Sequence, residues 1–140
     1  MSTPHNVCIV LGTRPEAIKL APVIQAFQAA PDFRTRVVLT GQHREMVAQV
    51  MELFGIQADH DLALMAPKQT LTHITCGALQ GLQAEFEQHK PDLVLVQGDT
   101  TTALPRPWRP FMPRCRWAMW RRACAPTTSW IPIRRRRTGA

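Results

Sequence analysis

The chain has 140 residues, enough for one domain of ordinary size but too few for a two-domain enzyme. Apolar residues make up 45% of it, which excludes disorder along the whole chain. A net charge of +7 is typical of nucleic-acid-binding proteins, but here the charge is unevenly distributed. Residues 1–104 hold 7 Lys and Arg against 10 Asp and Glu, whereas residues 105–140 hold 10 Arg and no acid.

Strands and helices are predicted to alternate along the first 104 residues. Apolar runs predict strands, and apolar residues at helical spacing predict helices that begin at Pro15, Arg44 and Thr70. Pro22 is expected to kink or split the first helix. The predicted order is strand 5–11, helix from 15, strand 36–40, helix 44–54, helix 70–89 and strand 92–97.

This order predicts an α/β fold with a parallel, Rossmann-like sheet covered by helices on both faces. Ligands of such sheets bind beyond the carboxyl ends of the strands. Three loops, 12–14, 41–44 and 98–101, fall at that edge. No apolar run long enough to span a membrane and no secretion signal is present, so we expect a cytoplasmic body.

The first of these loops combines a glycine turn, a cation and a helix start in residues 12–16 (GTRPE). Free backbone N–H groups at a helix N-terminus favour an anion, and Arg14 and Lys19 could add positive charge. The alternative is that both cations only solvate the helix surface.

The loops at 41–44 and 98–101 can each be explained by a binding role or by a structural role. Gln42 and His43 could donate hydrogen bonds to a ligand, or they could belong to a turn that starts a helix. Asp99 is placed either for catalysis or as a helix N-cap. Cys8 and Cys76 are expected to be small buried apolar residues, and the remaining histidines show no metal-ligand spacing.

Three segments resemble successive blocks of the non-hydrolysing UDP-N-acetylglucosamine 2-epimerases. They are residues 9–22 (IVLGTRPEAIKLAP), 40–55 (TGQHREMVAQVMELFG) and 92–102 (DLVLVQGDTTT). The resemblance covers residues 6–104 without a gap, and several long motifs in one order make it specific. It implies the N-terminal part of a two-domain, glycosyltransferase-B-type fold that is incomplete in this chain.

The resemblance also implies an activity and its residues. Members interconvert UDP-N-acetylglucosamine and UDP-N-acetylmannosamine by eliminating and re-adding UDP, act as homodimers, and need no metal or other cofactor. Arg14 and Lys19 would bind substrate, and Asp99 would be an active-site carboxylate that also contacts substrate. A second, activating UDP-sugar would lie near Gln42, His43 and Gln69.

After GDTTT the family continues to a block, GHVEAGLRT, which carries a catalytic glutamate and is absent from this chain. Trp and Met have one codon each, so residues 117–120 read TGG-GCN-ATG-TGG. Regrouping each third base with the next two gives Gly, one of His, Tyr, Asn or Asp, and Val. With free wobble bases, the run through Pro126 can encode GHVEAGLRT, and residues 105–116 with the flanking bases of codons 104 and 117 can encode AAALAAFYAAVPV.

We therefore predict that residues 1–104 form a partial Rossmann-like domain and that residues 105–140 are an irregular basic tail read out of frame. The chain itself is then expected to have little or no activity. Two alternatives remain open. The tail could be a nucleic-acid- or lipid-binding arm, since its tryptophans lie among arginines, or the chain could come from a glycosyltransferase of the same architecture.

Overall fold

The structure is a computed structural model that describes residues 3–97, 116–120 and 131–132. The strands lie in one sheet in the order β3-β2-β1-β4-β5-β6, and every neighbouring pair is parallel except β5 and β6. The predicted parallel α/β fold is confirmed. The elements in chain order are β1 (His5–Leu11), α1 (Arg14–Ala29), β2 (Phe33–Leu39), α2 (Arg44–Leu53), β3 (His60–Asp61), α3 (Leu71–His89), β4 (Leu93–Gln97), β5 (Arg116–Trp120) and β6 (Ile131–Pro132).

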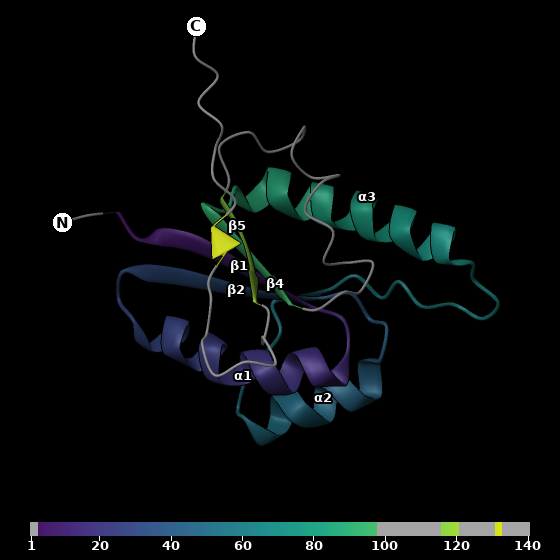
Figure 1. Ribbon diagram of the computed structural model, residues 1–140, viewed down its shortest axis with the longest axis horizontal. Helices are drawn as coiled ribbons and strands as arrows, with labels where there is room; N and C mark the ends of the chain where they lie inside the picture. The colour runs from purple at the N-terminus through teal and green to yellow at the C-terminus, as the bar shows by residue number, and fades with distance from the viewer. Residues whose placement is uncertain (1–2, 98–115, 121–130, 133–140) are drawn as a thin grey trace, which may run out of the picture.

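The helices cover both faces of the sheet (Figure 1). Helices α1 and α2 lie on one face, where Ile9 and Leu11 of β1 join one buried apolar cluster. Helix α3 lies on the other face, where Val10 joins a second cluster that includes Phe86. Alternate residues of β1 therefore point to opposite apolar layers, which explains why the strand shows no polar alternation in sequence.

Pro22 does not split α1, which runs unbroken over 16 residues. Proline removes one backbone hydrogen bond, whose acceptor would be the carbonyl of Ile18. Both residues lie on the exposed side of the helix, where water can bond that carbonyl. The opposite side buries Leu20 and Ile24 completely against the sheet, and this burial holds the helix together.

The tail differs from expectation at Arg116–Trp120, which form strand β5 parallel to β4. The Arg116 N–H donates to the Asp92 carbonyl at 2.9 Å. Strand pairing uses backbone groups, and these five residues contain no proline to interrupt it. Strand β4 would otherwise present an unpaired edge, so a nearby extended segment gains hydrogen bonds by joining it.

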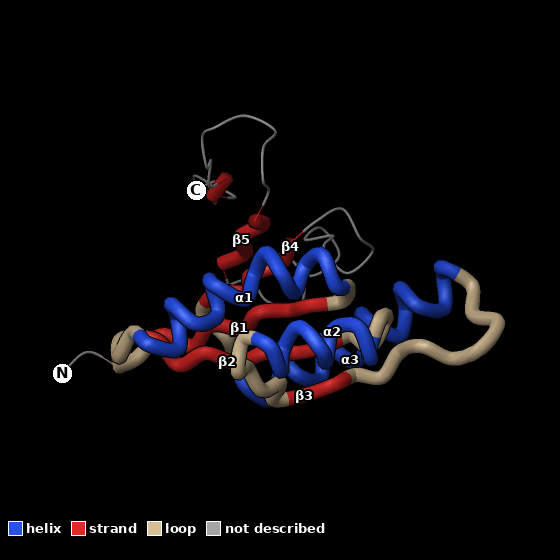
Figure 2. The backbone as a smooth tube through the Cα atoms, turned by 90° about the horizontal axis from the view of Figure 1, so that it is seen from below, coloured by secondary structure: helices blue, strands red, loops and turns tan. Residues whose placement is uncertain are grey.

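Two smaller differences concern the segment between β2 and the middle of α3. The short strand β3 was not predicted, because only two residues pair there. Cys76 was predicted to be buried but is exposed. The segment before α3 and the start of that helix extend beyond the other elements (Figure 2). None of the described helices is long and apolar enough to cross a membrane.

Candidate functional site at the carboxyl edge of the sheet

The loops after β1 and β2 meet at the carboxyl edge of the sheet, as predicted. The Thr40 N–H donates to the Leu11 carbonyl at 2.9 Å, and the His43 N–H donates to the Gly12 carbonyl at 3.3 Å. These bonds continue the parallel register of β1 and β2 past the last strand residues. The third loop of the predicted site, 98–101, lies outside the described residues, and so does Asp99.

Glu16 organises the first loop from inside helix α1. One oxygen of its carboxylate, Oε2, accepts the Gly12 N–H at 2.7 Å and the Thr13 N–H at 3.1 Å. Glu16 is only 5% exposed although it is charged. Thr13 is the N-cap residue, so Glu16 holds the position at which a capping-box acid reaches back to the start of its helix.

This arrangement narrows one sequence expectation, which stays a prediction. We expected backbone N–H groups at the start of α1 to favour an anion, but those of Gly12 and Thr13 donate to Glu16. The carboxylate already supplies the negative charge that a helix N-terminus favours. An incoming anion would therefore meet the side chain of Arg14, which is exposed, rather than these two amides.

Gly12 is tightly enclosed by polar oxygens. A Cβ atom at this position would lie 2.9 Å from both Thr40 Oγ1 and Gln42 Oε1, and 3.3 Å from Glu16 Oε2. Thr40 is fully buried, and its hydroxyl has no hydrogen-bond partner among the described residues. The side-chain oxygen of Gln97, at the end of β4, is also buried without a described partner. This edge thus holds polar groups that the described residues leave unsatisfied.

Gly12→Ala is expected to lower the free energy of unfolding by about 1–3 kcal/mol, because the new methyl group overlaps two side-chain oxygens. The midpoint of urea unfolding of the full chain measures this. Gly77→Ala is the matched control, since its Cβ would meet only the flexible end of Leu64 and alanine favours a helix interior. An unchanged midpoint for Gly12→Ala would mean that this enclosure is loose.

Arg14 and Lys19 both lie on the exposed surface of α1. Five residues separate them, which corresponds to about 7.5 Å along a helix and about 140° around it. No described ion pair or hydrogen bond involves either side chain. Arg14 is the first helical residue and follows the Gly12 loop directly, whereas Lys19 lies further along the helix.

The residues assigned to a second UDP-sugar are only partly brought together. Gln42 contacts the Gly12 loop, and His43 is the N-cap residue of α2. Gln69 lies farther along the segment before α3, where its Oε1 accepts the Ala66 N–H at 2.8 Å. No hydrogen bond among the described residues joins Gln69 to Gln42 or His43, so the grouping of these three stays a prediction.

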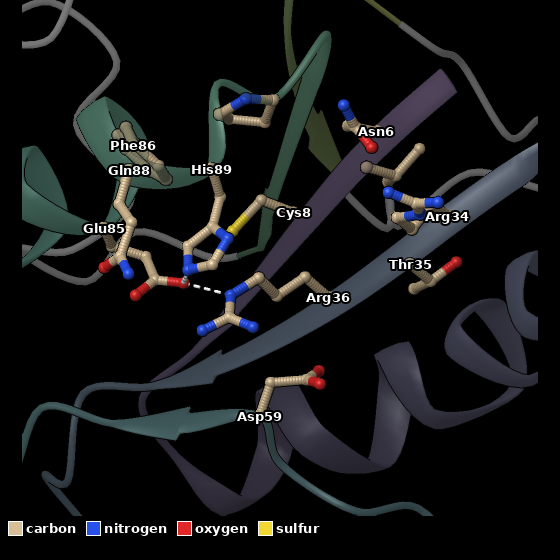
Figure 3. A pocket seen from close by; sticks show the side chains of 12 residues that line it. Asn6, Cys8, Arg34, Thr35, Arg36, Asp59, Glu85, Phe86, Gln88 and His89 are labelled. Carbon is tan, nitrogen blue, oxygen red and sulfur yellow. Dashed lines mark hydrogen bonds and ion pairs between the residues drawn. The ribbon is translucent and has the colours of Figure 1, made fainter. Parts of the chain in front are cut away.

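A hollow lies at the opposite, amino edge of the sheet. It measures about 390 Å³ and is bounded by the starts of β1 and β2 and the end of α3 (Figure 3). Glu85 is buried beside it. Its carboxylate accepts a hydrogen bond from Arg36 Nε and lies 2.7 Å from His60 Nδ1 and 3.7 Å from His89 Nε2.

Sequence reasoning missed both buried acids. Burial raises the pKa of Glu85, but hydrogen bonds from Arg36 and His60 outweigh it and hold this pKa below the ordinary value of 4.5. The sequence signal for the burial of Glu85 was its position between Leu82 and Phe86, on the apolar face of α3. For Glu16 the signal was the Thr-x-x-Glu spacing of a capping box.

His60 and His89, which show no metal-ligand spacing in the sequence, both lie beside the Glu85 carboxylate, and the sequence did not predict this contact. Within the described ranges, no group of three or more His, Cys, Asp or Glu side chains is arranged to hold a metal ion.

Comparisons with known proteins agree with the fold and with the sequence of this edge. The family model described as UDP-N-acetylglucosamine 2-epimerase matches residues 25–106, more than half of the chain. The chain belongs to this family. A UDP-N-acetylglucosamine 2-epimerase of Yersinia pestis is 55% identical over 99 residues, and that of Escherichia coli K12 is 54% identical over the same length.

Solved structures of the family have the same fold. The chain matches a Neisseria meningitidis UDP-GlcNAc 2-epimerase, bound to UDP-GlcNAc, with a TM-score of 0.74 and 44% identity. It matches the Methanocaldococcus jannaschii enzyme, in complex with UDP-GlcNAc and UDP, with a TM-score of 0.73 and 28% identity. Both matches cover 82% of this chain and 32% of the other. The kitacinnamycin glycotransferase, at 17% identity, shares only the fold.

The matches cover most of this chain but only a small part of each matched protein. The sequence match takes in 71% of this chain but 26% of the Yersinia enzyme, so the chain spans about a quarter of the length of these relatives. The structural match takes in 82% of this chain but 32% of the Neisseria meningitidis enzyme.

Proposed function

We propose that this chain carries the N-terminal part of an enzyme that interconverts UDP-N-acetylglucosamine and UDP-N-acetylmannosamine. The observation that carries the proposal is the carboxyl edge of the sheet, where the GTRPE and TGQHRE loops meet around Gly12. Relatives with 54–55% identity over this region are UDP-N-acetylglucosamine 2-epimerases. The family's reaction is an isomerisation at the sugar.

In this proposal the chain alone has little or no activity. Epimerisation by elimination and re-addition of UDP needs groups that move the proton at sugar C2 and cations that stabilise the departing diphosphate. Asp99 is the one proposed catalytic carboxylate in this chain. The glutamate of the GHVEAGLRT block has no counterpart in residues 105–140 as translated.

The tail is best explained as an out-of-frame translation that begins near codon 104, which leaves residues 1–104 as the family part. Strand β5 fits this account, because residues 117–120 stand where the shifted reading begins GHVE. A parallel strand at this point depends on backbone pairing, which a wrong frame does not abolish. A tail selected to bind nucleic acid is not favoured by any comparison.

Arg14 is proposed to contact the substrate, with Lys19 adding charge on the flank of α1. Gln42, His43 and Gln69 are proposed to contact a second UDP-sugar. Arg14 has the stronger geometric support, because it is exposed directly beside the Gly12 loop. Homodimer formation, a cytoplasmic location and the lack of a nucleic-acid partner stay predictions.

Arg14→Ala is expected to weaken binding of UDP-N-acetylglucosamine to this chain by about tenfold or more, the cost of losing a forked contact to phosphate. Binding by one lobe alone is expected to be weak, with a Kd of the order of 1 mM, so ligand-observed NMR is the suitable measurement. Arg14→Lys should recover part of the affinity, because lysine keeps the charge but not the fork.

Arg34→Ala is the matched control for that experiment. Arg34 is an exposed arginine at the amino edge of the sheet, so removing it changes the net charge equally without touching the proposed site. Equal losses for the two variants would show that the contact is nonspecific attraction, and the assignment of Arg14 would then be wrong.

A further inference from the structure

The buried carboxylate of Glu16 stands where a phosphate would bind in many α/β proteins. Glycine-rich loops that open a helix commonly bind phosphate through backbone N–H groups at the helix N-terminus. Here the sequence has the glycine, the turn and the helix start, but the N–H groups of Gly12 and Thr13 donate to Glu16 at 2.7 and 3.1 Å. The side chain is 5% exposed, so this carboxylate is built into the loop.

The polar groups around this carboxylate favour a ligand that donates hydrogen bonds. Gln42 Oε1 and Thr40 Oγ1 enclose Gly12 together with Glu16 Oε2. The Thr40 hydroxyl and Gln97 Oε1 are buried and have no partner in the described part of the chain. The carboxylate and amide oxygens of this set only accept hydrogen bonds, so the fully ionised diphosphate of a nucleotide sugar gains nothing from them, whereas sugar hydroxyl and acetamido N–H groups can donate to them. The Thr40 hydroxyl can donate or accept.

We propose that Glu16 is a specificity-determining residue that excludes free phosphate from the start of α1. The carboxylate occupies the two loop amides and repels a second anion at short range. A nucleotide sugar can then place its negative charge against exposed cations such as the Arg14 side chain rather than against these two amides. Discrimination of this kind works by penalising the wrong ligand as well as by binding the right one. This inference rests on the proposed function only where it names a nucleotide sugar as the ligand that is accepted. The exclusion of free phosphate does not depend on it.

The test is a titration of the ¹⁵N-labelled full chain with inorganic phosphate, followed through the amide signals of Gly12 and Thr13. In the wild-type chain these two signals are expected not to move in a saturable way. In Glu16→Ala they should shift saturably, with phosphate affinity raised about tenfold or more, because two amide donors and the helix dipole become available. Glu16→Gln should lie between, since its amide oxygen can still accept one N–H.

Glu45→Ala is the matched control. Glu45 is the first-turn acid of the neighbouring helix α2 and is exposed, so its removal changes the charge at the same edge without releasing loop amides. It should leave phosphate binding within about twofold of wild type. If Glu16→Ala does not fold, the wild-type titration and Glu16→Gln still decide the question.

The proposal is overturned if the wild-type Gly12 and Thr13 amides already bind phosphate. It is also overturned if folded Glu16→Ala or Glu16→Gln gains no more affinity than Glu45→Ala. Inorganic phosphate is the only probe required, so the outcome is separate from the fate of the proposed function. Failure of UDP-N-acetylglucosamine to bind the wild-type chain would remove the proposed function and leave the role of Glu16 against phosphate intact.

Discussion

Restoring one base near codon 104 is expected to turn an inactive chain into an active epimerase, provided that the DNA continues in the restored frame. Positioned acid–base groups typically contribute about 10²- to 10⁴-fold each, and the chain as translated lacks the GHVEAGLRT glutamate. We therefore expect turnover of UDP-N-acetylglucosamine by the 140-residue chain to fall below that of the restored protein by about 10⁴-fold or more. Chromatographic separation of the two UDP-sugars measures this.

Asp99→Asn in the restored protein is the matched control. It keeps the size of the side chain and removes the carboxylate, so turnover should fall by about 10²-fold or more while the protein stays folded. Detectable turnover by the purified 140-residue chain, above that of a mock preparation, would refute the account of an inactive chain. A restored protein that is folded and inactive would remove the epimerase assignment.

Glu85→Ala is expected to lower the free energy of unfolding by about 2–3 kcal/mol. Removing one member of a buried ion pair typically costs about 3–5 kcal/mol, because the partner stays behind without its counter-charge. The side chain of Arg36 is 29% exposed, so water can solvate part of the charge and the loss should be smaller. Urea unfolding of the full chain at neutral pH measures it.

Glu87→Ala, two residues along the same helix, is the matched control. Glu87 is exposed and its hydrogen bond to Gln83 lies on the surface, so the change should stay within about 0.5 kcal/mol. Glu85→Gln separates charge from packing because it keeps the shape of the side chain. If Glu85→Gln is as stable as wild type, the ion pair contributes nothing and the loss in Glu85→Ala comes from packing alone.

The same residue gives the fold a dependence on pH with a definite sign. The folded-state pKa of Glu85 is lower than its ordinary value of 4.5. Its contribution to stability is therefore fully present above about pH 4.5 and is lost as the pH falls through the folded-state pKa. Wild type should lose this contribution on acidification, so the stability gap between wild type and Glu85→Gln should narrow below pH 4.5.

Much of the fold could be predicted because its strands are short apolar runs separated by amphipathic helices. The predicted strand at 5–11 coincides with β1, and Thr70 is the N-cap residue of α3, as predicted. Strand β3 was not predicted, because a strand of two residues is too short to show an alternating or apolar sequence pattern. Strand β5 escaped it because the partner edge of β4, rather than any pattern in residues 116–120, selects that pairing.

The candidate site could be located from sequence, but its internal contacts could not. Motif order placed Arg14 and Gln42 at one edge of the sheet, and the structure joins their loops around Gly12. The role of Glu16 could not be read from sequence with certainty, since an acid in the first turn can face solvent or fold back onto the loop. Only the three-dimensional arrangement shows that it folds back.

The most direct test of the central claim is a fresh read of the source DNA across codons 95–145. The account predicts one additional base near codon 104, after which the frame continues from GDTTT through an alanine-rich helix into GHVEAGLRT. The true product would then be a longer epimerase. If the sequence is confirmed without that base, residues 105–140 are the genuine product, and this chain is a non-catalytic member of its family.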